Sequence, residues 1–174
     1  MENIEKDSNT LNFSLPGFSP DKTCCFTGRR KLPADKIGEI TEIIENRIEK
    51  AISDGYEFFI SGFADGTDLI AAEAVLKLQQ KYPHIHLIGA IPYKSRLKAL
   101  LKLDCFNRCS DTQVVCEEYV PECYSRRNRF MVDSSSLVIA VTDGKQTGGT
   151  AYTINYALKK GRELYIIRFD PQEE

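Results

Sequence analysis

The stretch LVIAVTDGKQTGGT, residues 137–150, has the pattern of a strand that runs through a loop into a helix. Its first five residues are β-branched or aliphatic and show no polar alternation. This pattern is typical of a strand that is buried on both faces, as in a parallel sheet with helices on either side. After the loop, Gly148-Gly149-Thr150 stands where the next helix is expected to begin. The stretch therefore predicts an α/β fold.

The same alternation of short apolar runs and helical patterns continues along the rest of the chain. Apolar residues from 37 to 51 recur every three or four positions, which predicts a helix that ends near Asp54-Gly55. Further helices are expected at 69–82, from Ser95 onward, at 122–135 and at 150–160. Strands are expected at 23–27, 56–60, 86–91 (ended by Pro92), 112–116, 137–141 and 164–168. The chain is thus predicted to form an α/β three-layer sandwich, a mostly parallel sheet of about six strands with helices on both faces.

Length and local composition divide the chain into an arm and one domain. Residues 1–21 are polar and contain Pro16, Gly17 and Pro20, which predicts a flexible N-terminal arm. Residues 22–174 are expected to form a single domain, because 174 residues suffice for one sizeable core. The sequence shows neither an export signal nor an apolar run of about 18 residues, so we expect a cytoplasmic protein with no membrane partner.

The overall charge argues against a nucleic-acid partner. The net charge is −2, the pI is about 5.8 and there is no tryptophan, so no global basic field is present. The six cysteines are read as reduced, mostly structural thiols, since their spacing matches no zinc pattern. We therefore expect no metal and no cofactor.

Glycines and polar side chains gather where three of the predicted strands end. In parallel sheets ligands bind beyond the carboxyl ends of the strands, so these loops are the expected site. Glycine lets a ligand approach the backbone, and the N–H groups of a helix N-terminus favour phosphate. Tight turns in any α/β protein offer the alternative explanation for each single loop. The candidate residues are Thr27, Gly28, Arg29 and Arg30 after the first strand, Ser61, Gly62, Asp65, Gly66 and Asp68 after the second, and Asp143, Gly148, Gly149 and Thr150 after the fifth.

Three arginines precede the stretch at 137–150. On a helix Arg126 and Arg129 share a face, and Arg127 lies about 100° from Arg126. At least one of the three is expected to face the protein while others face solvent.

Two sequence fingerprints of nucleotide binding are absent. No GxGxxG follows the first strand and no GxxxxGK[ST] occurs, which argues against dinucleotide binding and P-loop hydrolysis.

Four segments in register resemble the YpsA-like branch of the SLOG superfamily, which also includes the LOG and DprA proteins. The segments are TGRR (27–30), SGFADGTDLIAAEA (61–74), SRRNRFMVDSSSLVIAV (125–141) and GGTAYTINYALKKG (148–161). The resemblance covers roughly residues 22–170 and implies a Rossmann-like fold with a pocket for a nucleotide or a nucleotide-derived ligand. It also implies that Arg127 and Asn128 belong to the site and suggests a homodimer.

The chain departs from these relatives at two places. Arg29 stands where YpsA-like proteins usually carry histidine, which adds a fixed charge and removes a titratable group. The LOG motif GGxGTxxE is incomplete, because Thr153 occupies the place of its glutamate. Asp68 and Glu73 remain the candidate acids near the predicted edge. The balance is therefore against an enzyme.

Three functional hypotheses follow. The favoured one is a binding or sensor domain that holds a nucleotide-like phosphate ligand at the carboxyl edge of the sheet. The alternative is a LOG-like hydrolase of nucleoside monophosphates that uses Asp68 or Glu73. A further alternative is single-stranded DNA binding as in DprA, weakly supported by the arginines at 126–129.

Overall fold

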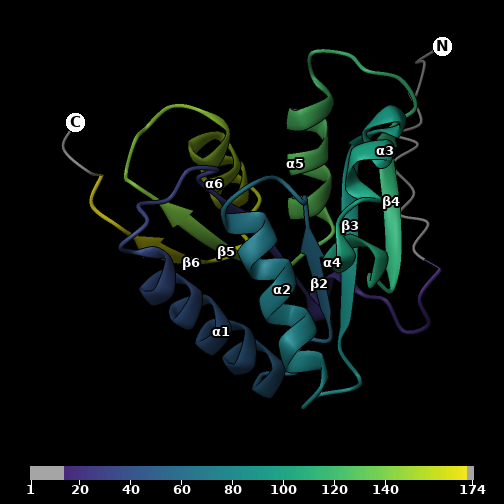
Figure 1. The fold of residues 1–174 in the computed structure, drawn as a ribbon, viewed down its shortest axis with the longest axis horizontal. Coiled ribbons are helices and arrows are strands. Elements are labelled where there is room, and N and C mark those ends of the chain that lie inside the picture. The colour runs from purple at the N-terminus through teal and green to yellow at the C-terminus, as the bar shows by residue number, and fades with distance from the viewer. Residues whose placement is uncertain (1–13, 172–174) are drawn as a thin grey trace, which may run out of the picture.

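The computed structural model describes residues 14–171 and contains one sheet of six parallel strands. The order across the sheet is β4-β3-β2-β1-β5-β6 (Figure 1). The strands are β1 (Thr23–Gly28), β2 (Phe58–Ser61), β3 (His86–Tyr93), β4 (Asp111–Cys116), β5 (Leu137–Thr142) and β6 (Glu163–Arg168). The strand order reverses between β1 and β5, which form a parallel pair from Cys24↔Leu137 to Gly28↔Val141. The predicted six-stranded parallel sheet is confirmed.

Helices cover both faces of the sheet, as the sequence predicts. Helices α1 (Ile37–Ser53) and α2 (Thr67–Gln79) pack together on one face, and α5 (Cys123–Asp133) and α6 (Gly149–Lys159) pack together on the other (Figure 1). Short helices α3 (Leu97–Leu100) and α4 (Asp104–Asn107) connect β3 to β4, and 3₁₀ turns occupy Pro20–Lys22 and Lys94–Arg96. The result is a three-layer, Rossmann-like α/β sandwich.

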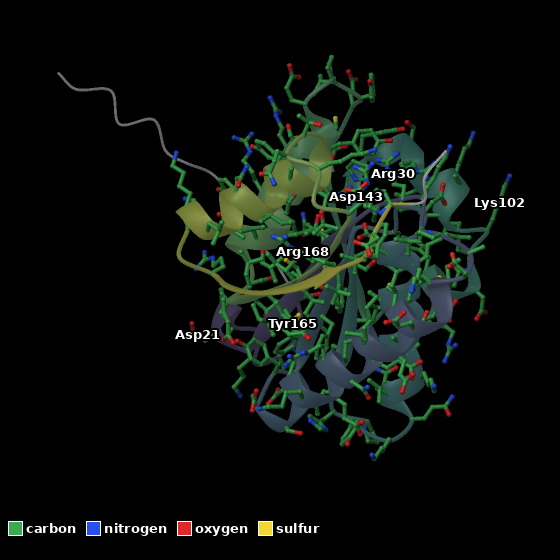
Figure 2. The ribbon with its side chains drawn as sticks, turned by 90° about the vertical axis from the view of Figure 1, so that its left-hand side faces the viewer. Asp21, Arg30, Lys102, Asp143, Tyr165 and Arg168 are labelled. Atoms are coloured by element: carbon green, nitrogen blue, oxygen red, sulfur yellow. The ribbon has the colours of Figure 1, made fainter. Side chains whose placement is uncertain are left out.

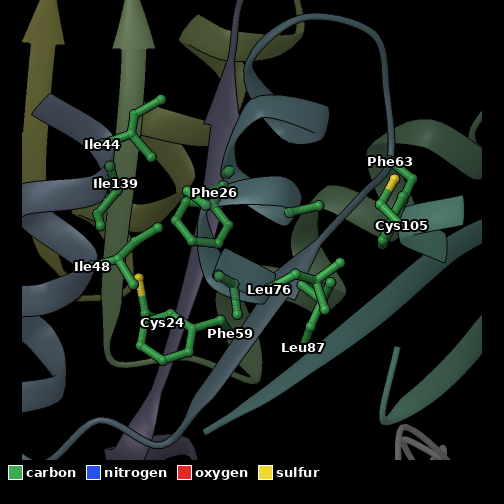
Figure 3. Packing of buried hydrophobic residues seen from close by; sticks show 14 of the residues in the cluster. Cys24, Phe26, Ile44, Ile48, Phe59, Phe63, Leu76, Leu87, Cys105 and Ile139 are labelled. Atoms are coloured by element: carbon green, nitrogen blue, oxygen red, sulfur yellow. The ribbon is translucent and has the colours of Figure 1, made fainter. Parts of the chain in front are cut away.

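Alternate residues of the central strands build two separate cores. In β1, Cys24 and Phe26 belong to the cluster under α1 and α2, whereas Cys25 belongs to the cluster under α5 and α6. Figure 3 shows the first cluster, where Phe26 and Phe59 stack with their ring centroids 6.4 Å apart. Because β1 is covered on both sides, a run without polar alternation is what this position requires.

Two local predictions after β3 are wrong. The strand does not end at Pro92 but continues to Tyr93, which pairs with Cys116 of β4. Pairing between β2 and β3 stops at Gly89, so the later residues of β3 have no neighbouring strand on that side. Pro92 lacks a backbone N–H, but on this open side its absence removes no hydrogen bond between strands. The helix expected from Ser95 shrinks to a 3₁₀ turn and the four residues of α3, and no side chain caps either.

The part of the expected N-terminal arm that the structure describes, residues 14–21, lies against the sheet. Leu15 and Phe18 pack on the cluster under α5 and α6, and the ring centroids of Phe18 and Phe58 are 5.2 Å apart. The backbone N–H and hydroxyl of Ser14 donate to Asp111. Residues 1–13 lie outside the described residues. Within residues 14–171, no helix has the length and apolar character needed to cross a membrane.

Candidate functional site

The carboxyl ends of the central strands enclose a pocket of about 450 Å³ beside the β1–β5 switch point. This switch-point pocket is where ligands bind in open α/β sheets. Figure 2 shows Arg30 and Asp143 at this edge of the molecule, beyond the end of β6. The pocket is lined by Phe26, Thr27, Gly28, Arg29, Arg30, Lys31, Ala64, Asp68, Tyr124, Arg127, Asn128, Gly149 and Thr150.

The two arginines after β1 have different environments. Arg29 Nε lies 3.3 Å from Oδ2 of Asp143, whose side chain is only 6% exposed and also lies 3.9 Å from the Lys145 ammonium. Arg30 forms no ion pair with a residue of the described range, and its guanidinium lies 5.4 Å from the centroid of the Tyr124 ring. Arg29 is therefore paired with Asp143, whereas the charge of Arg30 acts on Asp68 without an ion pair and is available to a ligand.

The loop after β2 is fixed to the loop after β1 by close backbone packing. The N–H and the hydroxyl of Thr67 both donate to the carbonyl of Arg29, at 3.2 and 3.0 Å. A Cβ on Gly28 would lie 2.6 Å from carbon atoms of Thr67. Gly66 has φ +76°, and a Cβ there would lie 2.6 Å from the Arg29 carbonyl oxygen. Gly28 and Gly66 thus allow the two loops to meet, a role that explains both residues without a ligand.

Ser61 organises the turn that leads into α2. Its hydroxyl donates to the Asp68 carbonyl at 2.9 Å and accepts the N–H of Phe63 at 3.2 Å. Phe63 has φ 52°, a left-handed conformation that is uncommon for a bulky residue. These contacts hold the first turn of α2, and with it Asp68, against the end of β2.

Asp68 and Arg127 form a buried, oppositely charged pair at the base of the pocket. They are 7% and 5% exposed, and a Cβ on Gly62 would lie 2.8 Å from atoms of both side chains. Arg127 Nη1 donates to the Gly62 carbonyl at 2.7 Å, and Asp68 accepts the N–H of Ala64 at 3.3 Å. Burial raises the pKa of Asp68 while the Arg127 charge opposes that rise, and burial lowers the pKa of Arg127 while Asp68 opposes that fall.

The N-terminus of α6 forms the opposite wall of the pocket. Gly148, with φ +91°, precedes the helix, and no side chain caps it. The N–H groups of Gly149 and Thr150 have no acceptor among residues 14–171, as expected for the first turn of a helix. The amide Nδ2 of Asn128 faces the same place, 4.0 Å from where a Cβ of Gly149 would stand. The Oδ1 of Asn128 already accepts a hydrogen bond from Arg127 Nε, so its NH₂ group is the part that faces the N-terminus of α6.

The structure separates the predicted site residues into three groups. Nine line the pocket: Thr27, Gly28, Arg29, Arg30, Asp68, Arg127, Asn128, Gly149 and Thr150. Ser61, Gly62, Gly66 and Asp143 contact the loops or side chains that line the pocket, and Gly148 is exposed just before α6. Asp65 lines a smaller neighbouring hollow with Arg96, and Glu73 is exposed on α2 beside Leu69 and Lys77, away from the pocket.

Four lining residues were not predicted, namely Phe26, Lys31, Ala64 and Tyr124. Tyr124 had a detectable signal, because it lies three positions before Arg127 and thus on the same helix face. Within the described chain, no group of three or more His, Cys, Asp or Glu residues is placed to hold a metal ion. All six cysteines are unpaired thiols.

Comparison with known proteins agrees with this architecture. The family model described as the YspA SLOG family matches residues 17–171. The chain belongs to this SLOG family. Similar proteins include the SPbeta prophage-derived protein YoqJ of Bacillus subtilis (strain 168), with 30% identity over 64% of this chain and 77% of that protein. A UPF0398 protein of Bacillus cereus (strain G9842) is 25% identical over 79% of this chain and 82% of its own length.

A solved structure extends the comparison to the DprA proteins. DNA processing protein A from Helicobacter pylori aligns with a TM-score of 0.59 and 19% identity, over 89% of this chain and 67% of that one. At this identity the likeness concerns the fold. That structure is described as showing a single-stranded DNA binding mode, which contradicts our expectation that nucleic acid is an unlikely partner. The expectation relied on a net charge of −2, which averages over the surface and does not show that Arg30 and Lys31 lie together at one pocket.

Proposed function

We propose that this SLOG domain binds single-stranded DNA by taking one phosphate-bearing nucleotide unit into the switch-point pocket. The observation that carries the proposal is that the N-terminus of α6 and the unpaired Arg30 line the same hollow. Backbone N–H groups at a helix N-terminus, the helix dipole and a guanidinium all favour a phosphate. Lys31 adds a second cation at the rim.

The remaining walls suit the sugar and base of the same unit. Tyr124 presents an aromatic ring to the pocket, and Asn128 offers an amide donor beside the helix N-terminus. Aromatic side chains stack on bases without regard to sequence. A volume of about 450 Å³ falls within the range of small-ligand sites, so the pocket fits one nucleotide unit and not a duplex. An unstacked base of a single strand can enter such a pocket, whereas a paired base cannot.

Two further points favour binding over catalysis. Asp68 is the carboxylate among the lining residues, and it is engaged by the Ala64 N–H and the Arg127 charge. Glu73, the other candidate acid, lies on the outer side of α2. The fold neighbour described as binding single-stranded DNA supports the choice of ligand. A free nucleotide offers the same phosphate and base chemistry, so the experiment must distinguish the two sources.

The test is fluorescence anisotropy with a labelled single strand of about 16 nucleotides, the upper end of common site sizes. The single strand is expected to bind more tightly than the matching duplex, and AMP or ADP-ribose is expected to compete only weakly. Arg30→Ala should weaken binding by about ten- to a hundredfold, the value of a hydrogen bond to a charged group. It should also make the slope of log affinity against log salt concentration, called the salt slope below, less steep by about 0.7.

Arg108→Ala serves as the matched control, because Arg108 is an exposed arginine just before β4, at the opposite edge of the sheet. This variant should bind the strand as the parent does. Equal affinity of Arg30→Ala and the parent would show that the pocket is not the binding site. Tight binding of AMP or ADP-ribose without binding of the strand would replace single-stranded DNA by a free nucleotide as the ligand.

A further inference from the structure

Helix α5 carries two arginines that the switch-point pocket does not use. Arg127 is buried and points to Gly62, whereas Arg126 and Arg129, three positions apart, are exposed. Neither forms an ion pair with a residue in the described part of the chain. Both line a second hollow of about 330 Å³ on the outer side of α5, together with Val115, Phe130, Asp133 and Tyr156.

Helix α6 adds aromatic rings and a further cation beside this hollow. The rings of Tyr152 and Tyr156 stack with centroids 6.4 Å apart and planes inclined by 7°, and Tyr152 is 42% exposed. The Lys160 ammonium lies 5.6 Å from the centroid of the Tyr156 ring. Arg126, Arg129, Tyr152, Tyr156 and Lys160 are called the α5/α6 surface below.

The carboxylate of Asp133, which lines this hollow, accepts hydrogen bonds from Tyr156. The Tyr156 hydroxyl donates to both Asp133 oxygens, at 2.8 and 3.0 Å. Burial and this hydrogen bond raise the pKa of Tyr156 to about 12, so the hydroxyl remains a proton donor at neutral pH. The neutral hydroxyl does not cancel the charge of Asp133, but Arg126, Arg129 and Lys160 outnumber this one carboxylate, so an anion is the complementary partner of the α5/α6 surface.

The α5/α6 surface adjoins the switch-point pocket along both helices. On α5, Asn128 lines the pocket and the next residue, Arg129, lines the outer hollow. On α6, Thr150 lines the pocket and Tyr152 follows two positions later on the exposed side. The two helices pack side by side, as Figure 1 shows. A chain that leaves the pocket between Asn128 and Thr150 therefore meets arginines on one helix and stacked rings on the other.

We propose that the α5/α6 surface is a second binding segment for the same single strand, with Arg126 and Arg129 on its phosphates and the exposed ring of Tyr152 under a base. This inference rests on the proposed function, because the switch-point pocket anchors the strand. Basic side chains interleaved with aromatic rings are the usual means of holding single strands without regard to sequence. The segment lengthens the contact and does not alter what the pocket binds.

The test compares strand lengths in the double variant Arg126→Ala/Arg129→Ala. A strand of about 16 nucleotides reaches both segments, whereas a dinucleotide occupies the pocket alone. The double variant should bind the long strand at least about tenfold more weakly and lower its salt slope by about 1.4, the value of two phosphate contacts to a single strand. Its affinity for the dinucleotide should not change. Arg126→Lys/Arg129→Lys should restore most of the salt slope, because it retains both charges.

Lys77→Ala/Lys81→Ala is the matched control, since it removes two exposed charges from the opposite face of the sheet. Tyr152→Leu should weaken binding of the long strand and leave the dinucleotide unaffected. An unchanged salt slope in Arg126→Ala/Arg129→Ala, with Arg30→Ala still impaired, would refute the second segment and leave the proposed function intact. Equal loss for both strand lengths would show an effect on the pocket instead and would also refute it. Competition by polyglutamate as strong as that by the single strand would identify the surface as an acidic-protein site.

Discussion

Replacing Arg127 by methionine tests whether the buried Asp68–Arg127 pair holds the site together. Methionine keeps the unbranched length and the helix propensity of arginine but removes its charge and its donors. The change leaves the Gly62 carbonyl without the Nη1 donor that now lies 2.7 Å away. It also removes the stronger of the two cationic influences on Asp68, which is 7% exposed and then keeps only the charge of Arg30.

The expected loss follows from these two consequences. A buried acceptor without a partner costs about 1–3 kcal/mol. Removing one member of a buried ion pair costs about 3–5 kcal/mol. Because Arg30 and the Ala64 N–H still stabilise the charge of Asp68, we expect a loss at the lower end of this range, about 3 kcal/mol. With a urea dependence of about 2 kcal/mol per M, this loss lowers the midpoint of unfolding by about 1.5 M. The assay is urea unfolding followed by circular dichroism.

Arg126→Met provides the control in the same helix. Arg126 is exposed, so its replacement should change the free energy of unfolding by no more than about 0.5 kcal/mol. In a double-mutant cycle, Arg127→Met combined with Asp68→Asn should be less destabilised than the sum of the single changes by about 0.5–3 kcal/mol. A loss in Arg127→Met no greater than that in Arg126→Met, or strict additivity with Asp68→Asn, would refute the argument.

Three further predictions concern the core and the loops. Burial raises the pKa of Asp68, so its contribution to stability is complete below the unfolded value of about 3.9 and is lost as pH rises through the raised folded value. Relative to Asp68→Asn, the parent should therefore lose unfolding free energy as pH rises above about 4, and a difference independent of pH would contradict this. Gly28→Ala places a Cβ 2.6 Å from carbon atoms of Thr67 and should lower the free energy of unfolding by about 1–3 kcal/mol in the same urea assay. Gly38→Ala in α1 has nothing within 4 Å of its new Cβ and should raise it by about 0.5–1 kcal/mol. Equal effects of the two changes would show that the loops can separate freely. Burial raises the pKa of the Cys25 thiol to about 12, so iodoacetamide should not modify Cys25 in the native protein. Mass spectrometry should detect the modification only after unfolding in urea, and labelling without denaturant would disprove the buried placement.

Most of the fold could be predicted because it follows from local periodicity. Apolar runs without alternation identified the central strands, and spacing of three and four residues identified α1 and α2. The errors occurred where context decides. Pro92 continues β3 because β2 has already ended beside it, and Ser95 does not begin a longer helix. Neither condition is visible in the residues themselves.

The candidate site was predicted in location more fully than in the roles of its residues. The rule that ligands bind at the carboxyl ends of parallel strands placed nine of the predicted residues around one pocket. Helical spacing also predicted that one arginine of the group at 126–129 faces inward, and that residue is Arg127. Spacing could not show that Glu73 faces away from the pocket on α2. The net charge misled about nucleic acid, because it carries no information on where charges lie.

The sequence by itself determined the order of strands and helices, the buried character of β1 and β5, and the edge of the sheet at which the candidate pocket lies. These properties depend on patterns a few residues long, because local periodicity decides which segments form strands or helices and which faces they bury. Only the tertiary structure decided that Asp143 pairs with Arg29 and not with Arg30, and that Gly28, Gly62 and Gly66 allow the close approach of loops and buried side chains. It also placed Arg126 and Arg129 beside the tyrosines of α6. The physical reason is that ion pairing and steric contact depend on distance in space, and residues as far apart in the chain as Arg29 and Asp143 meet only when the strands pair.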